Sequence, residues 1–167
     1  MVINNRRYLN NKSGNIVYYE NLYPLYLYVT DNIEEALSTF NFYRTLEDLK
    51  DGNIASTQPK INFDNTLGYT MLVSLKDGSG LGVLILINSK KETVLKTAAH
   101  ESTHYTDAIF DYIGAYAQSF DESNEPYAYL LGWCYACISD FLNYRKEKSK
   151  KINKTCKKKK KEEKTIS

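Results

Sequence analysis

The spacing of apolar and polar residues changes along the chain, and each change predicts a different element. Residues 15–30 are rich in Tyr, Val, Ile and Leu with Pro24 in the middle, which is typical of two short strands or of one interrupted edge strand. From Asp31 onward, apolar positions recur every three to four residues behind an acidic first turn. This spacing predicts one helix that ends near Gly52.

Two apolar runs, residues 67–75 and 81–89, follow a polar loop. The segment between them, Lys76 to Gly80, has the composition of a tight turn, so the runs predict an antiparallel hairpin. The second run is apolar on both faces, which favours a place inside the sheet.

Two helices are expected after the hairpin. Ser89 and Glu92 form a capping-box pattern for the first, which should end near Gly114. The second begins within residues 123–126 and is apolar nearly all round as far as Leu142, so we expect it to be the central buried helix. The chain therefore predicts a single α+β domain with a small, mostly antiparallel sheet packed on helices.

Composition supports one domain followed by a basic tail. The 167 residues, 43% of them hydrophobic, can bury a core without disulfides or a structural metal. The net charge of +2 divides into +9 for the segment from Arg145 to Lys164 and −7 for residues 1–144. We expect residues 1–144 to fold and residues 145–167 to be a disordered tail after a short helical start. Its charge suits a solubilising or tethering role, or binding to an acidic partner or nucleic acid.

Cysteine use and hydropathy indicate a compartment. The 3 cysteines have no framework spacing, and the first 14 residues lack the apolar core of a secretory signal. The longest aliphatic run, Leu81 to Ile87, is too short to cross a membrane. We expect a cytoplasmic protein with reduced thiols and no membrane partner. Cys134 and Cys137 form a C-x-x-C within the apolar helix and are interpreted as packing residues.

Both histidines of the chain lie in one motif, because the segment from His100 to His104 reads H-E-x-x-H. The spacing of four residues places both imidazoles on one helix face, where they can share a zinc ion, with Glu101 beside a metal-bound water. The same residues can also form an ordinary solvated cluster. Asp107 and Asp111 continue this polar face, either as partners that orient the imidazoles or as exposed surface.

A catalytic zinc normally takes three protein ligands, and no third histidine exists in the chain. An acidic cluster at the start of the last helix would return beside the histidines if the two helices are antiparallel. Glu125 is the predicted third ligand, with Glu122 and Asp121 as alternatives. The same acids would also stabilise a helix N-terminus without any metal. Iron, cobalt and manganese suit this ligand set as well.

The combination of His100-Glu101-x-x-His104 with Asn124-Glu125 resembles the gluzincin branch of zinc metallopeptidases, the thermolysin-like enzymes. The likeness covers about residues 81–133, which are also loosely similar to small zincin-like proteins of bacteriophages. It implies a zincin-type fold and Zn²⁺ held by His100, His104 and Glu125. Glu101 would then be the general base in peptide hydrolysis. The resemblance also implies that one arm of the hairpin pairs with an extended peptide substrate.

Two roles found in thermolysin-like enzymes cannot be assigned to one particular residue of this chain. Thermolysin-like enzymes carry an Asp four residues after the ligand Glu, where this chain has Tyr129. Either Asp107, Asp111 or Asp140 takes over that role, or the imidazole is held differently. The tetrahedral oxyanion needs a donor besides zinc. The tyrosine candidates are Tyr105, Tyr116, Tyr127 and Tyr129.

The expected function is zinc-dependent hydrolysis of a peptide or protein substrate, in a host cytoplasm or a virion if the chain is phage-encoded. The alternative is a catalytically inactive zincin-fold structural or interaction protein tethered through its lysine-rich tail. A tail-driven nucleic-acid-binding protein is a third reading. Retention of Glu101 favours the enzyme, because a structural zinc site does not need an uncoordinated base.

Overall fold

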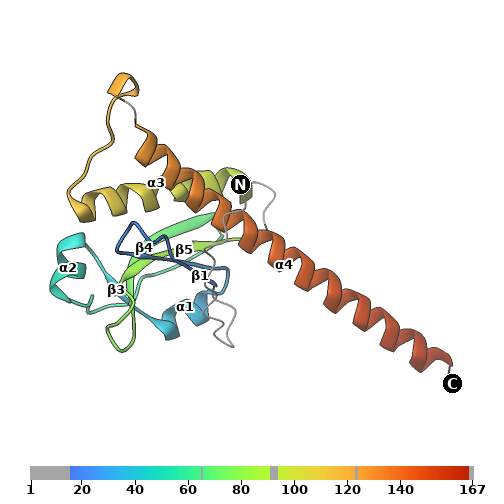
Figure 1. The fold of residues 1–167 in the computed structure, drawn as a ribbon. Coiled ribbons are helices and arrows are strands. Elements are labelled where there is room, and N and C mark those ends of the chain that lie inside the picture. Colours follow the sequence, from blue (N-terminus) through green and yellow to red (C-terminus); the bar gives the residue numbers. More distant parts are fainter. Residues whose placement is uncertain (1–15, 65, 91–93, 123, 166–167) are drawn as a thin grey trace.

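A five-stranded mixed sheet with helices on both faces forms the body of the protein (Figure 1). The computed structural model describes residues 16–64, 66–90, 94–122 and 124–165. The sheet has the order β1-β2-β5-β4-β3, in which β2 and β5 are parallel and the other pairs are antiparallel. Its strands are β1 (Ile16–Tyr18), β2 (Tyr26–Thr30), β3 (Phe40–Tyr43), β4 (Gly68–Leu75) and β5 (Gly82–Ile87). The predicted α+β class, the two short strands around Pro24 and the hairpin are confirmed.

The helices divide between the two faces of the sheet. Among the described residues they are α1 (Ile33–Thr39), α2 (Leu46–Asp51), α3 (Val94–Ile113) and α4 (Glu125–Thr165), with one 3-10 turn, η1 (Phe120–Glu122). One buried cluster joins the sheet to α3 and α4, and a second joins its other face to α1. The helix that carries the H-E-x-x-H motif therefore lies directly on the sheet.

Strand β5 is the centre of the core, as its apolar composition predicts. All its residues from Gly82 to Ile87 are buried. Val83 and Ile85 face the cluster with α3 and α4, whereas Leu84 and Leu86 face the cluster with α1. Each such aliphatic side chain contributes roughly 1.5–3 kcal/mol on burial.

The single helix predicted from Asp31 to Gly52 is wrong, because β3 separates α1 from α2. Phe40 and Phe42 alternate into the cluster beneath α1, and the strand pairs with β4 from Phe40 opposite Leu75 to Tyr43 opposite Leu72. The sequence F-N-F-Y suits a strand, and pairing with β4 outweighs the helical spacing around it. Gly52 does end α2, in the left-handed conformation with φ 73°.

The H-E-x-x-H helix ends as predicted. Gly114 has φ 70°, and the N–H of Ala115 donates to the carbonyl of Phe110 at 2.8 Å. The predicted cap at its start falls partly outside the described residues, because Glu92 is not among them. The Ser89 hydroxyl donates instead to Asp31 at 2.7 Å.

Helix α4 packs its first half into the core and then leaves the body (Figure 1). Leu130, Cys134, Ile138 and Phe141 have no exposed surface, which confirms the predicted buried helix. The thiols of Cys134 and Cys137 are free and buried, and burial raises the pKa of Cys134. Their interpretation as packing residues is confirmed.

The basic segment differs from its sequence prediction. The sequence predicts a disordered tail after a short helical start, whereas the backbone of α4 continues as helix to Thr165. The segment contains neither proline nor glycine and is rich in lysine, which tolerates helix well. No helix within the described ranges is long and apolar enough to span a bilayer.

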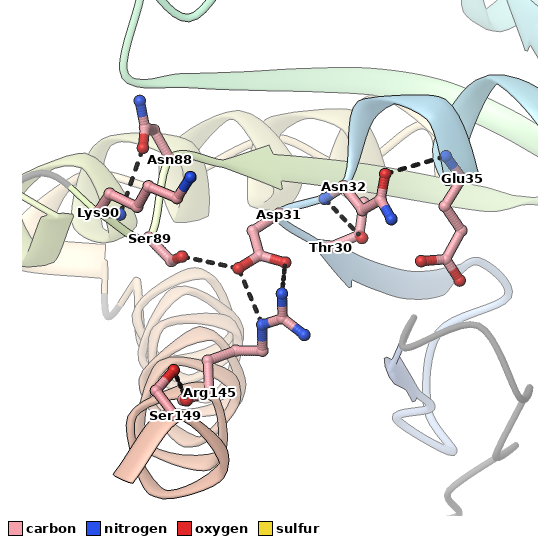
Figure 2. Close-up of polar contacts among 9 residues, drawn as sticks. All are labelled: Thr30, Asp31, Asn32, Glu35, Asn88, Ser89, Lys90, Arg145 and Ser149. Carbon is pink, nitrogen blue, oxygen red and sulfur yellow. Dashed lines mark hydrogen bonds and ion pairs between the residues drawn. The ribbon is translucent and has the colours of Figure 1, made fainter. Parts of the chain in front are cut away.

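An ion pair fixes the point at which α4 leaves the body. Arg145 donates to Asp31 through Nε to Oδ2 at 2.9 Å and pairs with it through Nη2 to Oδ1 at 2.7 Å (Figure 2). Ser89 completes the carboxylate's contacts, and the Asp31 side chain is only 10% exposed. The cluster thus joins the end of β2, the segment after β5, and α4.

Replacing Asp31 with Ala is expected to lower the free energy of unfolding by about 2 kcal/mol, because Arg145 and Ser89 would lose their shared acceptor. The loss should be smaller than for a fully buried pair, since the Arg145 side chain is 32% exposed. Urea denaturation of Asp31→Ala, Arg145→Met and the double variant measures the coupling. Asp51→Ala, at an exposed site on α2, is the control. A coupling free energy of zero between the two substitutions would mean that the ion pair does not stabilise the fold.

Candidate metal centre

The two histidines of α3 converge on one point. His100 and His104 are exposed and lie one turn apart, and their Nε2 atoms are 3.2 Å from each other. The ring planes meet at 89°, with the centroids 4.7 Å apart. Both imidazoles therefore present the same nitrogen to the same small volume.

This geometry fits two ligands of one metal ion. A tetrahedral zinc with metal–nitrogen distances of about 2.0–2.1 Å holds its ligand nitrogens about 3.3 Å apart. The observed separation of 3.2 Å is close to that value. Without an ion, the same distance allows a hydrogen bond between the rings, with the donor set by the tautomer. The donor set therefore suits a divalent metal without requiring one.

Glu101 lies beside the histidines but is buried against the sheet, with 5% of its surface exposed. The Thr70 hydroxyl of β4 donates to Glu101 Oε2 at 2.5 Å. Gly68 makes this approach possible, because a Cβ there would lie 2.7 Å from Glu101 Oε1 and 2.9 Å from Thr97 Cγ2. The carboxylate is thus held in one position by β4.

Sequence reasoning missed Thr70 and Gly68. They precede Glu101 by 31 and 33 positions, so only the packing of α3 on β4 brings them to it. A glycine and a threonine that share one strand face are common, and no local motif marks them. Their separation by two residues does place both on the side of β4 that faces α3.

An open cleft of about 460 Å³ runs between β4, α3 and the start of α2. The residues that line it are Gly68 to Leu72, Leu46, His100, Glu101, His104, Ala108 and Asp111. Since side chains alternate along a strand, five consecutive lining residues mean that the backbone edge of β4 itself faces the cleft. We refer to this cavity as the cleft.

Half of that β4 edge has no strand partner among the described residues. Strand β3 pairs only with Leu72 to Leu75, so the edge from Gly68 to Met71 is open. A second cavity of about 390 Å³ continues along β4 beyond His100. Its lining includes Thr66, Leu67, Lys96 and Thr97. Together the two cavities form a path along the strand that passes the histidine pair.

The structure does not bring a third ligand to the histidines. Within the described ranges, no three His, Cys, Asp or Glu side chains are placed so that they could hold a metal together. Glu125 is exposed at the start of α4, and Asp121 and Glu122 are exposed in η1 (Figure 1, orange segment above α3). Their role as ligands therefore remains a prediction.

The two acids beyond His104 have different surroundings. The Tyr127 hydroxyl donates to Asp107 Oδ1 at 2.6 Å. Partial burial, together with the hydrogen bond and the charge of Asp107, raises the pKa of Tyr127 to about 12, so the phenol stays a donor at neutral pH. Asp107 is thus engaged by α4, whereas Asp111 lines the cleft.

None of the four tyrosines considered as oxyanion donors lines the cleft. Tyr105 is fully buried, and its hydroxyl lies 3.5 Å from the carbonyl of Leu25. Tyr116 and Tyr129 are exposed elsewhere, and Tyr127 is engaged by Asp107.

Comparison with known proteins gives no relative. No protein-family model matches the chain, and no curated protein or solved structure is significantly similar to it.

Proposed function

We propose that this protein is a metal-dependent peptidase of zincin type, with zinc as the expected metal. The observation that carries the proposal is the convergence of His100 and His104 Nε2 at 3.2 Å beside the buried carboxylate of Glu101. These groups open onto a cleft that exposes a strand edge. Two metal-ligating imidazoles, an adjacent base and a peptide-binding edge are the parts that peptide hydrolysis needs.

The open edge of β4 gives the substrate its place. An extended peptide can add to Gly68–Met71 as a further strand, with backbone hydrogen bonds supplying affinity. Such a strand would lie about 4.8 Å from β4 and would pass over the histidine pair. The scissile carbonyl would thus be held near both imidazoles and Glu101.

The chain's own residues have separate tasks in the proposed reaction. His100 and His104 would hold the metal, which supplies Lewis acidity that makes a water molecule acidic near neutral pH and polarises the carbonyl. Glu101 would accept a proton from the attacking water and deliver it to the amine as the peptide bond breaks. The hydroxyl of Thr70 would keep the carboxylate in place through both transfers.

One observation favours the second candidate, which is a non-catalytic zincin-like interaction protein. The described residues offer no third metal ligand beside the histidines. A two-histidine site holds metal weakly, since it lacks the charge of a carboxylate. In that case the basic extension of α4 would carry the function by tethering the body to an acidic partner.

A screen of internally quenched peptides tests the proposal. The protein, loaded with one equivalent of Zn²⁺, is expected to cleave at least one peptide at neutral pH, and a chelator should stop the cleavage. Restoring Zn²⁺ should restore the rate. Absence of metal-dependent cleavage across the library, with metal demonstrably bound, would favour the interaction protein.

A further inference from the structure

We propose that the cleft selects peptides by a lysine or arginine side chain that binds in the half of the cleft between His104 and Asp111. This inference rests on the proposed peptidase function and adds the substrate class. It follows from the chemistry of the two ends of the cleft, which differ in charge. Asp111 lines the end beyond His104, and Lys96 lines the cavity beyond His100.

The residues that line the Asp111 half suit a long basic side chain. Leu46 and Ala108 line it together with Leu72, and Leu46 and Ala108 also pack against the main core. Lysine and arginine bury their aliphatic stems on such surfaces while the charged head stays at a polar rim. Asp111 supplies a carboxylate at that rim.

The position of Asp111 fixes which substrate residue it can reach. It follows His104 by seven residues on the same helix face, which is about 10.5 Å along α3. An extended peptide advances about 3.3 Å per residue. The selected side chain would therefore be about three residues from the peptide position opposite His104, on the side that lies toward Asp111.

Charge favours this occupant. Asp111 is exposed, and its carboxylate makes no hydrogen bond or ion pair with the described part of the chain. Lys50, the basic residue of α2, lies over the ring of Tyr112, with its Nζ 5.0 Å from the ring centroid. Residues 1–144 carry a net charge of −7, which attracts a basic peptide over a longer range. Lys96 would repel the same side chain from the other half, so the peptide has one preferred register.

Binding to a Glu101→Gln protein tests the inference without turnover. Labelled eight-residue peptides, each with one lysine moved through an otherwise uncharged sequence, are titrated by fluorescence anisotropy in the presence of Zn²⁺. One lysine position is expected to bind about fivefold more tightly than its glutamine counterpart, with the preference reduced at high salt. Adding Asp111→Asn should remove the preference, and Asp111→Lys should transfer it to glutamate. Asp51→Asn, outside both cavities, is the matched control.

The possible results distinguish this inference from the proposed peptidase function on which it rests. Peptides that bind or are cleaved with no lysine preference, or with a preference that survives Asp111→Asn, would overturn the substrate class and leave the peptidase proposal standing. Failure of every peptide to bind and to be cleaved would overturn both. Because Asp111 is exposed, its substitution leaves the core untouched, and circular dichroism verifies the fold of each variant.

Discussion

Glu101→Gln is expected to reduce the rate of peptide hydrolysis by about 10²–10⁴-fold, which is the contribution typical of a general acid–base residue. The amide has nearly the same shape as the carboxylate, and its oxygen can still accept the hydrogen bond from Thr70. It cannot take a proton from water at neutral pH. The change should therefore remove the reaction and keep the fold and the metal.

The measurement compares initial rates on a cleaved peptide with zinc stoichiometry by elemental mass spectrometry and with melting temperature. Glu47→Gln, an exposed glutamate on α2, is the matched control and should keep the full rate. A Glu101→Gln protein that retains the wild-type rate would show that Glu101 is not the base. Loss of zinc in that variant would instead make Glu101 a ligand.

His104→Ala is expected to weaken zinc binding at least 100-fold, because it removes one of the two nitrogens that converge on the same point. Isothermal titration with Zn²⁺ measures the loss directly. A thermal shift measures it independently, since bound metal stabilises the folded state by RT ln(1 + [Zn²⁺]/Kd). Thr103→Ala, on a neighbouring part of α3, is the control. Unchanged zinc affinity in His104→Ala would contradict the metal centre.

The same titration of the Glu125→Ala protein with Zn²⁺ tests whether Glu125 is the third ligand. A loss comparable to that of His104→Ala would mean that the connection between α3 and α4 brings its carboxylate to the histidines when metal binds. Glu122→Ala and Asp121→Ala test the two alternatives in turn. If none of these three substitutions changes the zinc affinity, the ligands that the protein supplies would be the two histidines alone.

How well the sequence predicts a feature depends on how far apart in the chain the interacting residues are. The convergence of His100 and His104 depends only on helix periodicity, so the motif predicts it. The strand β3 was missed because its backbone hydrogen bonds are made with β4, 29 to 35 positions away, and local spacing does not record them. The contact of Thr70 with Glu101 escaped prediction for the same reason.

Packing of two antiparallel helices does not by itself bring a third metal ligand to the histidines. The sequence placed α4 next to α3, and this is correct: the rings of Tyr105 and Trp133 lie 6.1 Å apart, and Tyr127 reaches Asp107. Yet Tyr105 is on the buried side of α3, away from the exposed histidines. Which side of a helix its neighbour covers depends on the packing of both helices against the sheet, and no spacing in the sequence specifies that.

The ion pair between Asp31 and Arg145 also gives the protein a mechanical property. Helix α4 continues about 30 Å beyond Arg145, at 1.5 Å per residue, and the residues after Arg145 carry a net charge of +8. A partner bound to this basic end would pull on the body at the point held by the ion pair. The carboxylate of Asp31 is shared with Ser89, which lies shortly before α3 in the chain. Force applied to the basic end would therefore reach the body where Arg145 and Ser89 share the carboxylate of Asp31, between β2 and the segment after β5.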